Sequence, residues 1–254
     1  MLKELFKNID NPLLNIYFTA GYPHLESMSE ILLGLEEAGV DMVEIGIPYS
    51  DPLSDGTTIQ NSSAIAIKNG INTNLIFDQL AKCPSSIPKI LMGYFNAVYI
   101  YGIETFCKKC KENSIVGVIL PDLPIDIYQE KYKELFEEHG ISFIFLITPE
   151  TSESRIRYID ECSTSFIYAV SSSSTTGNNT NIKSSEEYLS RLKKMKLNNP
   201  LMVGFNISNK EDFNFVASYA SGGIIGSAFI KHIAGSENLK LDTKTFIKSI
   251  REKK

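Results

Sequence analysis

The sequence predicts an α/β fold: a single (β/α)8 TIM barrel over residues 1–254, with an extra N-terminal helix and a short helix after the eighth strand. Two observations support this prediction. Eight short apolar runs alternate with longer segments of helical periodicity, and no linker or change of composition divides the chain. An open doubly wound sheet is the alternative, but the first apolar run is followed by Ala-Gly-Tyr-Pro-His and not by the Gly-rich turn of that fold.

The eight apolar runs predict strands. They are rich in Ile, Val, Leu and Phe and lack a regular alternation with polar residues, as expected for parallel strands that are buried on both faces. The predicted strands are Leu14–Thr19, Met42–Ile47, Lys89–Met92, Gly117–Leu120, Phe143–Ile147, Phe166–Val170, Leu201–Val203 and Gly223–Ile225.

The segments between the runs predict helices. Leu25–Ala38 is typical, because it places its apolar residues (Met28, Ile31, Leu32 and Leu35) on one face and ends before Gly39. The polar run Ser171–Asn181 predicts a mobile loop. The other predicted helices are Met1–Asn11, Glu104–Asn113, Ile125–His139, Ser184–Lys196, Asn209–Ala220 and Ser227–Ile233.

Composition excludes several classes of protein. The chain has 25 basic and 30 acidic residues, a net charge of −5 and a pI of about 5.4, which disfavours nucleic acid or an anionic membrane as partner. No apolar run approaches the roughly 18 residues of a membrane span, and the N-terminus does not resemble a signal peptide. Cys107 and Cys110 form a C-x-x-C motif inside a predicted helix, without a second pair or a nearby His. We expect a cytoplasmic protein that holds no metal.

In a TIM barrel the chemistry lies at the C-terminal ends of the strands. No Lys ends a predicted strand, so a Schiff-base mechanism has no nucleophile, and no His or Cys cluster could hold zinc. Two carboxylates remain: Glu44 in a run that should be apolar, and Asp55 in the loop that follows. A buried carboxylate can act as a proton shuttle, and a second, more solvent-exposed carboxylate can act as a fixed anion. The alternatives are a core Glu bonded to a neighbour and a turn-forming or helix-capping Asp.

The last two strands carry a second signal. Strand seven ends in Gly204-Phe205-Asn206, and strand eight ends in Gly226-Ser227 before a short predicted helix. Strands seven and eight with such a helix form the usual phosphate site of this fold, because the first N–H groups of the helix point over the barrel.

The segment from Glu44 to Gln60, EIGIPYSDPLSDGTTIQ, resembles the signature of the tryptophan synthase alpha chain family. The resemblance extends over the chain and includes Phe18–Pro23, Met92–Asn96, Leu120–Pro124, Thr175–Gly177 and Gly226–Ala228. It implies the TIM barrel predicted above. It also implies cleavage of indole-3-glycerol phosphate to indole and glyceraldehyde 3-phosphate by a carbon–carbon lyase without metal or cofactor on this chain, in an α2β2 complex whose beta chain carries pyridoxal phosphate.

The resemblance also implies roles for individual residues. Glu44 would be the general acid/base, Asp55 the partner of the indole N–H, and Tyr168 an active-site tyrosine. Thr176 of the mobile loop would close over the site and bond Asp55. The phosphate would be bound by Gly177, Phe205, Asn206, Gly226 and Ser227, and the indole pocket would include Tyr17, Met92, Tyr94 and Asp122.

Two positions depart from the family pattern. Asn206 replaces a glycine, but Asn is the residue other than Gly that best tolerates left-handed backbone. The loop reads Ser-Ser-Ser-Thr-Thr-Gly in place of Arg-x-Gly-Val-Thr-Gly, which affects loop closure more than chemistry. The competing interpretations are indole-glycerol-phosphate synthase, whose catalytic Lys is missing, phosphoribosylanthranilate isomerase, whose Cys/Asp pair is missing, and a non-catalytic activating subunit.

Overall fold

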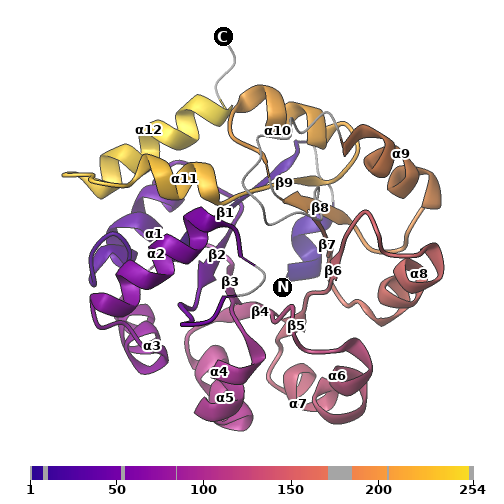
Figure 1. The fold of residues 1–254 in the computed structure, drawn as a ribbon, viewed down its shortest axis with the longest axis horizontal. Coiled ribbons are helices and arrows are strands. Elements are labelled where there is room, and N and C mark those ends of the chain that lie inside the picture. The colour runs from indigo at the N-terminus through magenta and orange to yellow at the C-terminus, as the bar shows by residue number, and fades with distance from the viewer. Residues whose placement is uncertain are drawn as a thin grey trace.

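The computed structural model describes residues 2–7, 11–52, 55–83, 85–170, 185–204 and 206–251. Within them nine parallel strands form one sheet, in the order β5-β4-β3-β2-β1-β9-β8-β7-β6. Since β5 and β6 stand at the two ends of this order and are consecutive in the chain, the sheet closes into the predicted barrel (Figure 1). The strands are β1 (Leu13–Thr19), β2 (Met42–Gly46), β3 (Lys89–Met92), β4 (Ile115–Ile119), β5 (Ser142–Phe143), β6 (Leu146–Ile147), β7 (Ile167–Val170), β8 (Leu201–Gly204) and β9 (Gly222–Ile225).

The fifth predicted strand, Phe143–Ile147, is wrong as a continuous element, because it is divided into β5 and β6. The first piece pairs with β4 and the second with β7, so the segment changes partner at Ile144 and Phe145. Its backbone groups stay satisfied: Ile144 N donates to Val118 O, and Phe145 O accepts from Tyr168 N. The change of partner is where the barrel closes.

Helices surround the sheet (Figure 1). The periodicity of the first long helix is confirmed, since Met28, Ile31, Leu32 and Leu35 are all buried. The helices are α1 (Ser27–Glu37), α2 (Thr57–Lys68), α3 (Thr73–Lys82), α4 (Phe95–Tyr101), α5 (Ile103–Glu112), α6 (Ile125–Lys131), α7 (Lys133–Glu138), α8 (Glu153–Cys162), α9 (Glu186–Met195), α10 (Lys210–Ala217), α11 (Ser227–His232) and α12 (Leu239–Arg251).

The predicted helix Ile125–His139 is wrong as one element, because it is broken into α6 and α7 at Tyr132. This residue has φ −125°, outside the helical range. Its ring packs against Phe95, with 5.5 Å between the ring centroids. A contact with a distant segment thus accompanies a break that the local periodicity does not encode.

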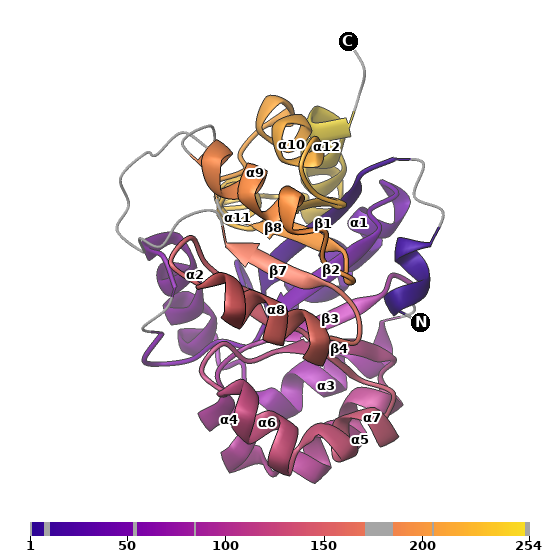
Figure 2. The ribbon, with the colours of Figure 1, turned by 90° about the vertical axis from the view of Figure 1, so that its right-hand side faces the viewer.

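The predicted N-terminal helix Met1–Asn11 is wrong as one element, because η1 (Leu2–Phe6) is a 3₁₀ helix and Lys7 and Asn11 are not helical; Met1 and residues 8–10 lie outside the described residues. Leu2 is buried with the residues that point into the barrel, and the ring of Phe6 lies 5.6 Å from that of Phe166. In Figure 2, η1 lies at the end of the barrel opposite the arrowheads of the strands. Its apolar side chains close the barrel there and leave the other end for the site.

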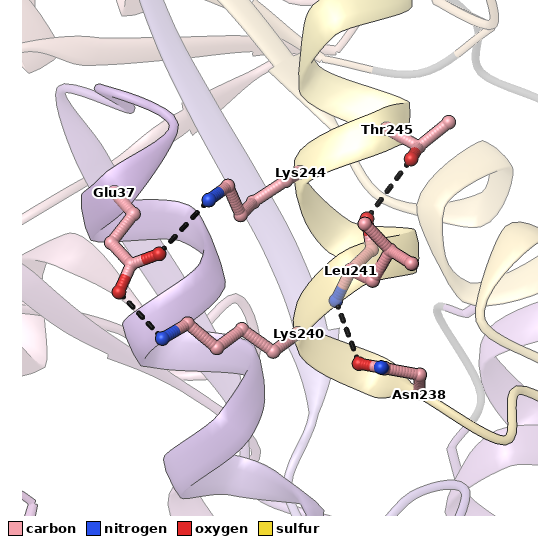
Figure 3. A network of polar contacts seen from close by, with 6 residues as sticks. All are labelled: Glu37, Asn238, Lys240, Leu241, Lys244 and Thr245. Carbon is pink, nitrogen blue, oxygen red and sulfur yellow. Dashed lines mark hydrogen bonds and ion pairs between the residues drawn. The ribbon is translucent and has the colours of Figure 1, made fainter.

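The C-terminal helix α12 packs against α1. The carboxylate of Glu37 on α1 binds Lys240 Nζ at 2.5 Å and Lys244 Nζ at 3.0 Å (Figure 3). At the other end of α12, Arg251 pairs with Asp41. These ion pairs tie α12, which follows β9, to α1 and Asp41, which follow β1; β1 and β9 pair directly in the sheet. In the part of the chain that the structure describes, no helix is long and apolar enough to cross a membrane.

Candidate active site

Glu44 lies in the middle of β2 and shares a face with Met42, which points into the barrel. The side chain is fully buried. Asn15 Nδ2 donates a hydrogen bond to Glu44 Oε1 at 2.6 Å, and Oε2 has no partner. Burial raises the pKa of Glu44 to about 8, although the bond from Asn15 acts to lower it. Glu44 is therefore mostly protonated at neutral pH and has one free oxygen.

Two buried tyrosines lie near Glu44, Tyr17 on β1 and Tyr168 on β7. A Cβ added to Gly46, the last residue of β2, would come within 2.1 Å of Tyr17 Oη. A Cβ added to Gly204, the last residue of β8, would come within 2.1 Å of Tyr168 Oη. Each phenol thus occupies space that a neighbouring strand leaves free because it ends in glycine.

Both phenols lie within electrostatic reach of both carboxylates. Burial raises the pKa of Tyr17 and of Tyr168 well above the ordinary value, and the charges of Glu44 and Asp55 raise both further. The tyrosines therefore stay neutral at any physiological pH and can donate hydrogen bonds. The structure brings these four predicted site residues together at the same end of the barrel.

Asp55 lies two residues before α2. Its carboxylate is hydrogen-bonded to Tyr94, and burial raises its pKa to about 6. Its backbone oxygen accepts a bond from Gln60 Nε2 at 2.7 Å. The N-cap of α2 is Gly56, so the helix-capping interpretation of Asp55 is not supported. At neutral pH this carboxylate is mostly an anion.

Aromatic rings form a wall after β3. Tyr94 stacks on Tyr49 with 5.0 Å between centroids, and Asn96 Nδ2 donates to Tyr49 Oη at 2.9 Å. Met92, at the end of β3, packs half-buried against the barrel interior. Asp122 is exposed, and its carboxylate accepts from Phe95 N at 2.8 and 3.0 Å. Asp122 thus holds the N-terminus of α4 and places Tyr94 indirectly.

The predicted phosphate residues lie partly in the described chain. Asn206 has φ +58°, so the left-handed backbone expected at this departure from glycine is confirmed. Gly226 precedes α11, and a Cβ there would lie 3.3 Å from the ring of Tyr17. Ser227 is exposed at the first position of α11. Thr176, Gly177 and Phe205, and the predicted loop Ser171–Asn181, lie outside the described residues.

The sequence prediction missed the roles of four residues. Asn15 holds Glu44, and its signal was an amide in an otherwise apolar run. The hydroxyls of Thr19 and Ser62 are 2.7 Å apart and connect the end of β1 to α2, just beyond Asp55. Tyr49 stacks on Tyr94, and no local pattern in the sequence predicts this contact.

The arrangement suits proton transfer on an aromatic substrate. A buried acid with a free oxygen faces neutral phenols, and an anion lies beside an aromatic wall. A mostly protonated carboxyl can give a proton and take one back, while the anion stabilises positive charge that forms nearby. Among the described residues, no three His, Cys, Asp or Glu side chains gather as a metal-ion site would require.

Comparisons with known proteins agree on one family. Residues 5–253 match the family model described as tryptophan synthase alpha chain. The tryptophan synthase alpha chain of Christiangramia forsetii is 51% identical over 245 residues, 95% of each chain. A variant alpha-subunit from Pyrococcus furiosus superposes with a TM-score of 0.84 at 33% identity, covering 94% of this chain and 97% of that one. A chain of tryptophan synthase from M. tuberculosis in its aminoacrylate-bound form gives 0.85 at 27% identity, covering 98% and 99%.

Proposed function

This chain belongs to the tryptophan synthase alpha chain family, and from that premise we propose that it cleaves indole-3-glycerol phosphate into indole and glyceraldehyde 3-phosphate. The family makes it a lyase of tryptophan biosynthesis. The observation that carries the proposed reaction is Glu44, a buried carboxyl with a pKa of about 8 and an oxygen without a partner. The cleaved bond joins two carbons, so the proposed enzyme is a carbon–carbon lyase.

Glu44 moves the proton in both directions. Its carboxyl protonates indole C3, which turns the ring into a cationic indoleninium. The resulting carboxylate then takes the proton from the hydroxyl on the neighbouring glycerol carbon. As the bond from C3 to that carbon breaks, its electron pair returns to the ring and the hydroxyl carbon becomes the aldehyde. Glu44 ends protonated, as it began.

Asp55 supplies the fixed negative charge. Its carboxylate accepts the indole N–H and stabilises the cation that forms after C3 is protonated. The bond to Tyr94 orients this carboxylate and places it beside the aromatic wall. Tyr168 and Tyr17 line the pocket with neutral phenols, and Met92 adds apolar surface against the indole ring. We expect Asp122 to act by placing Tyr94.

The phosphate group lies, in this proposal, at the ends of β8 and β9. Asn206, Gly226 and Ser227 provide backbone N–H groups there, together with Gly177 and Phe205, and Thr176 closes over Asp55. The left-handed backbone of Asn206 supports this assignment, since the family has glycine at that position.

We also propose that the chain binds a beta chain in an α2β2 complex in the cytoplasm. The pyridoxal phosphate belongs to that partner, and this chain passes indole to it. Two exposed apolar side chains on α4, Tyr99 and Ile100, support a partner surface beside the strand ends, because 62% and 76% of their surface is open to solvent. Pro48 and Asp51 precede Asp55 in the same loop, and we expect this loop to share the contact.

An indole-release assay tests the proposal. The purified chain is given indole-3-glycerol phosphate with and without its beta chain, and indole is measured directly. Release that depends on Glu44 supports the proposal. If the chain releases no indole in either condition but activates the beta chain, it is a non-catalytic activating subunit.

A further inference from the structure

Asn15 is an unusual residue for its position. It lies on β1 between Met42 of β2 and Ile224 of β9 in the strand register, and both neighbours are buried and apolar. Asn15 is itself fully buried. Its Oδ1 has no hydrogen-bond partner, and a buried acceptor without a partner costs free energy. An apolar residue would suit this layer better, so stability does not explain the amide.

We propose that Asn15 is a positioning residue for Glu44: its amide holds Oε1 in both protonation states and so leaves Oε2 to exchange the proton with the substrate. The proposal deepens the proposed function and rests on it. The supporting geometry is the 2.6 Å bond from Asn15 Nδ2 to Oε1, together with the free Oε2.

A neutral amide suits a group that must gain and lose a proton. Oε1 can accept from Nδ2 as the carbonyl oxygen of the acid or as an oxygen of the carboxylate. The bond becomes stronger when Glu44 is ionised, because the acceptor then carries charge. It therefore favours the carboxylate and opposes the effect of burial. A charged partner would instead fix Glu44 in one state.

The other groups around Glu44 do not replace Asn15. Tyr17 of β1, Tyr168 of β7 and Asp55 of the following loop act on the site through their charges and dipoles, and β3 contributes the apolar Ile90. Within the described chain, only Asn15 is hydrogen-bonded to Glu44.

Asn15→Leu tests the proposal, because it keeps the branched shape and the number of side-chain heavy atoms and removes the amide. We expect kcat to fall about ten- to a hundredfold, the size of a lost bond to a charged group, while KM changes less than about twofold. The pH above which activity falls should move upward, since the ionised Glu44 has lost its donor. Met42→Leu is the matched control: it alters the same layer without a polar group and should change neither quantity.

Infrared difference spectra give a readout that does not depend on activity. The C=O stretch of protonated Glu44 is identified by its loss in Glu44→Gln, and we expect it to shift in Asn15→Leu and not in Met42→Leu. If Asn15→Leu does not fold, Asn15→Ser makes the same test, because serine is too short to reach Oε1. An unshifted band, or an unchanged kcat and pH profile in a folded variant, overturns the proposal. If the wild-type chain releases no indole, the proposed function fails. The infrared shift alone then decides whether Asn15 is hydrogen-bonded to Glu44.

Discussion

The phenol oxygen of Tyr17 lies directly against Gly46, where an added Cβ would meet it at 2.1 Å and would meet Cζ of the same ring at 2.6 Å. Tyr168 has the same relationship with Gly204 across the barrel, with 2.1 and 2.5 Å to the corresponding atoms. Tyr17 and Tyr168 can therefore keep these positions near Glu44 only because β2, the neighbour of β1, and β8, the neighbour of β7, each end in glycine.

We expect Gly46→Ala to displace Tyr17. Overpacking of this kind costs about 1–3 kcal/mol of the free energy of unfolding, and a displaced phenol should also lower kcat/KM. Gly56→Ala is the control for a Cβ without a clash, because a Cβ at Gly56 would meet nothing within 4 Å, and its only expected cost is the replaced N-cap of α2, at most about 1 kcal/mol. Urea denaturation of both variants measures the difference. Equal stability would show that Tyr17 can move aside without cost.

The sequence predicts the barrel because parallel strands buried on both faces must be apolar along their whole length, and such runs are visible. The interruption between β5 and β6 and the break at Tyr132 coincide with contacts to distant segments. Phe145 O pairs with Tyr168 N, and Tyr132 packs against Phe95. Neither contact can be predicted from the local periodicity of the sequence.

The candidate site, too, can be predicted only in part from the sequence. Glu44 stands out because a carboxylate in an apolar run needs an explanation. Asn15 carries a similar signal, but its connection to Glu44 depends on the register that sets Asn15 opposite Met42. That register follows from how β1 and β2 pair, and neither strand's sequence shows it alone.

The proposed phosphate site predicts effects of different size for two changes at Ser227. Ser227→Asp places a negative charge beside the bound phosphate, so KM should rise at least about tenfold while kcat changes little. Ser227→Ala removes a hydroxyl but keeps the backbone N–H, and KM should change only a few-fold. Calorimetric titration with glycerol phosphate measures the same loss of affinity directly. An unchanged KM in Ser227→Asp would place the phosphate elsewhere.

The proposed partner surface predicts that Ile100→Asp weakens binding of the beta chain. A charge at the centre of an apolar contact must be desolvated, so we expect the Kd to rise at least about tenfold in calorimetric titration. Leu241→Asp is the matched control, because Leu241 is 57% exposed on α12, in another part of the ring of helices. Asp51→Ala and Pro48→Gly should also weaken binding, since their loop adjoins the site. If only Leu241→Asp weakened binding, the partner would bind near α12.

The two raised pKa values predict a bell-shaped dependence of kcat on pH, with a maximum near neutrality. Asp55 must be ionised to stabilise the cation, so activity should fall as the pH drops through about 6. Glu44 must carry the proton, so activity should fall as the pH rises through about 8. A phosphate monoester also titrates near pH 6, so kcat is measured at saturating substrate. Asp55→Asn should lower kcat and remove the acid limb; an unchanged acid limb would assign it to another group.

Glu44→Gln should separate a catalytic Glu44 from a structural one. The amide keeps shape and volume but cannot give a proton, so kcat should drop about 10²–10⁴-fold in a folded protein. Stability should change with pH in a defined direction. The carboxyl ionises near its ordinary value of 4.5 in the unfolded chain and near 8 in the folded one. Between these values the folded chain binds one proton more, so raising the pH destabilises the wild type.

Glu44→Gln has no proton at this position, so its stability does not fall in this way. The difference in free energy of unfolding, variant minus wild type, should therefore be smallest near pH 5 and should increase up to about pH 8. The raised pKa of Asp55 acts in the same direction but is present in both proteins and cancels. Glu161→Gln, at an exposed position on α8, makes the same change of carboxylate to amide away from the site and is the control. Denaturation at pH 5, 7 and 9 and indole release on one preparation test both expectations. A variant that unfolds supports a structural Glu44, whereas a folded and fully active one excludes it as the acid/base residue.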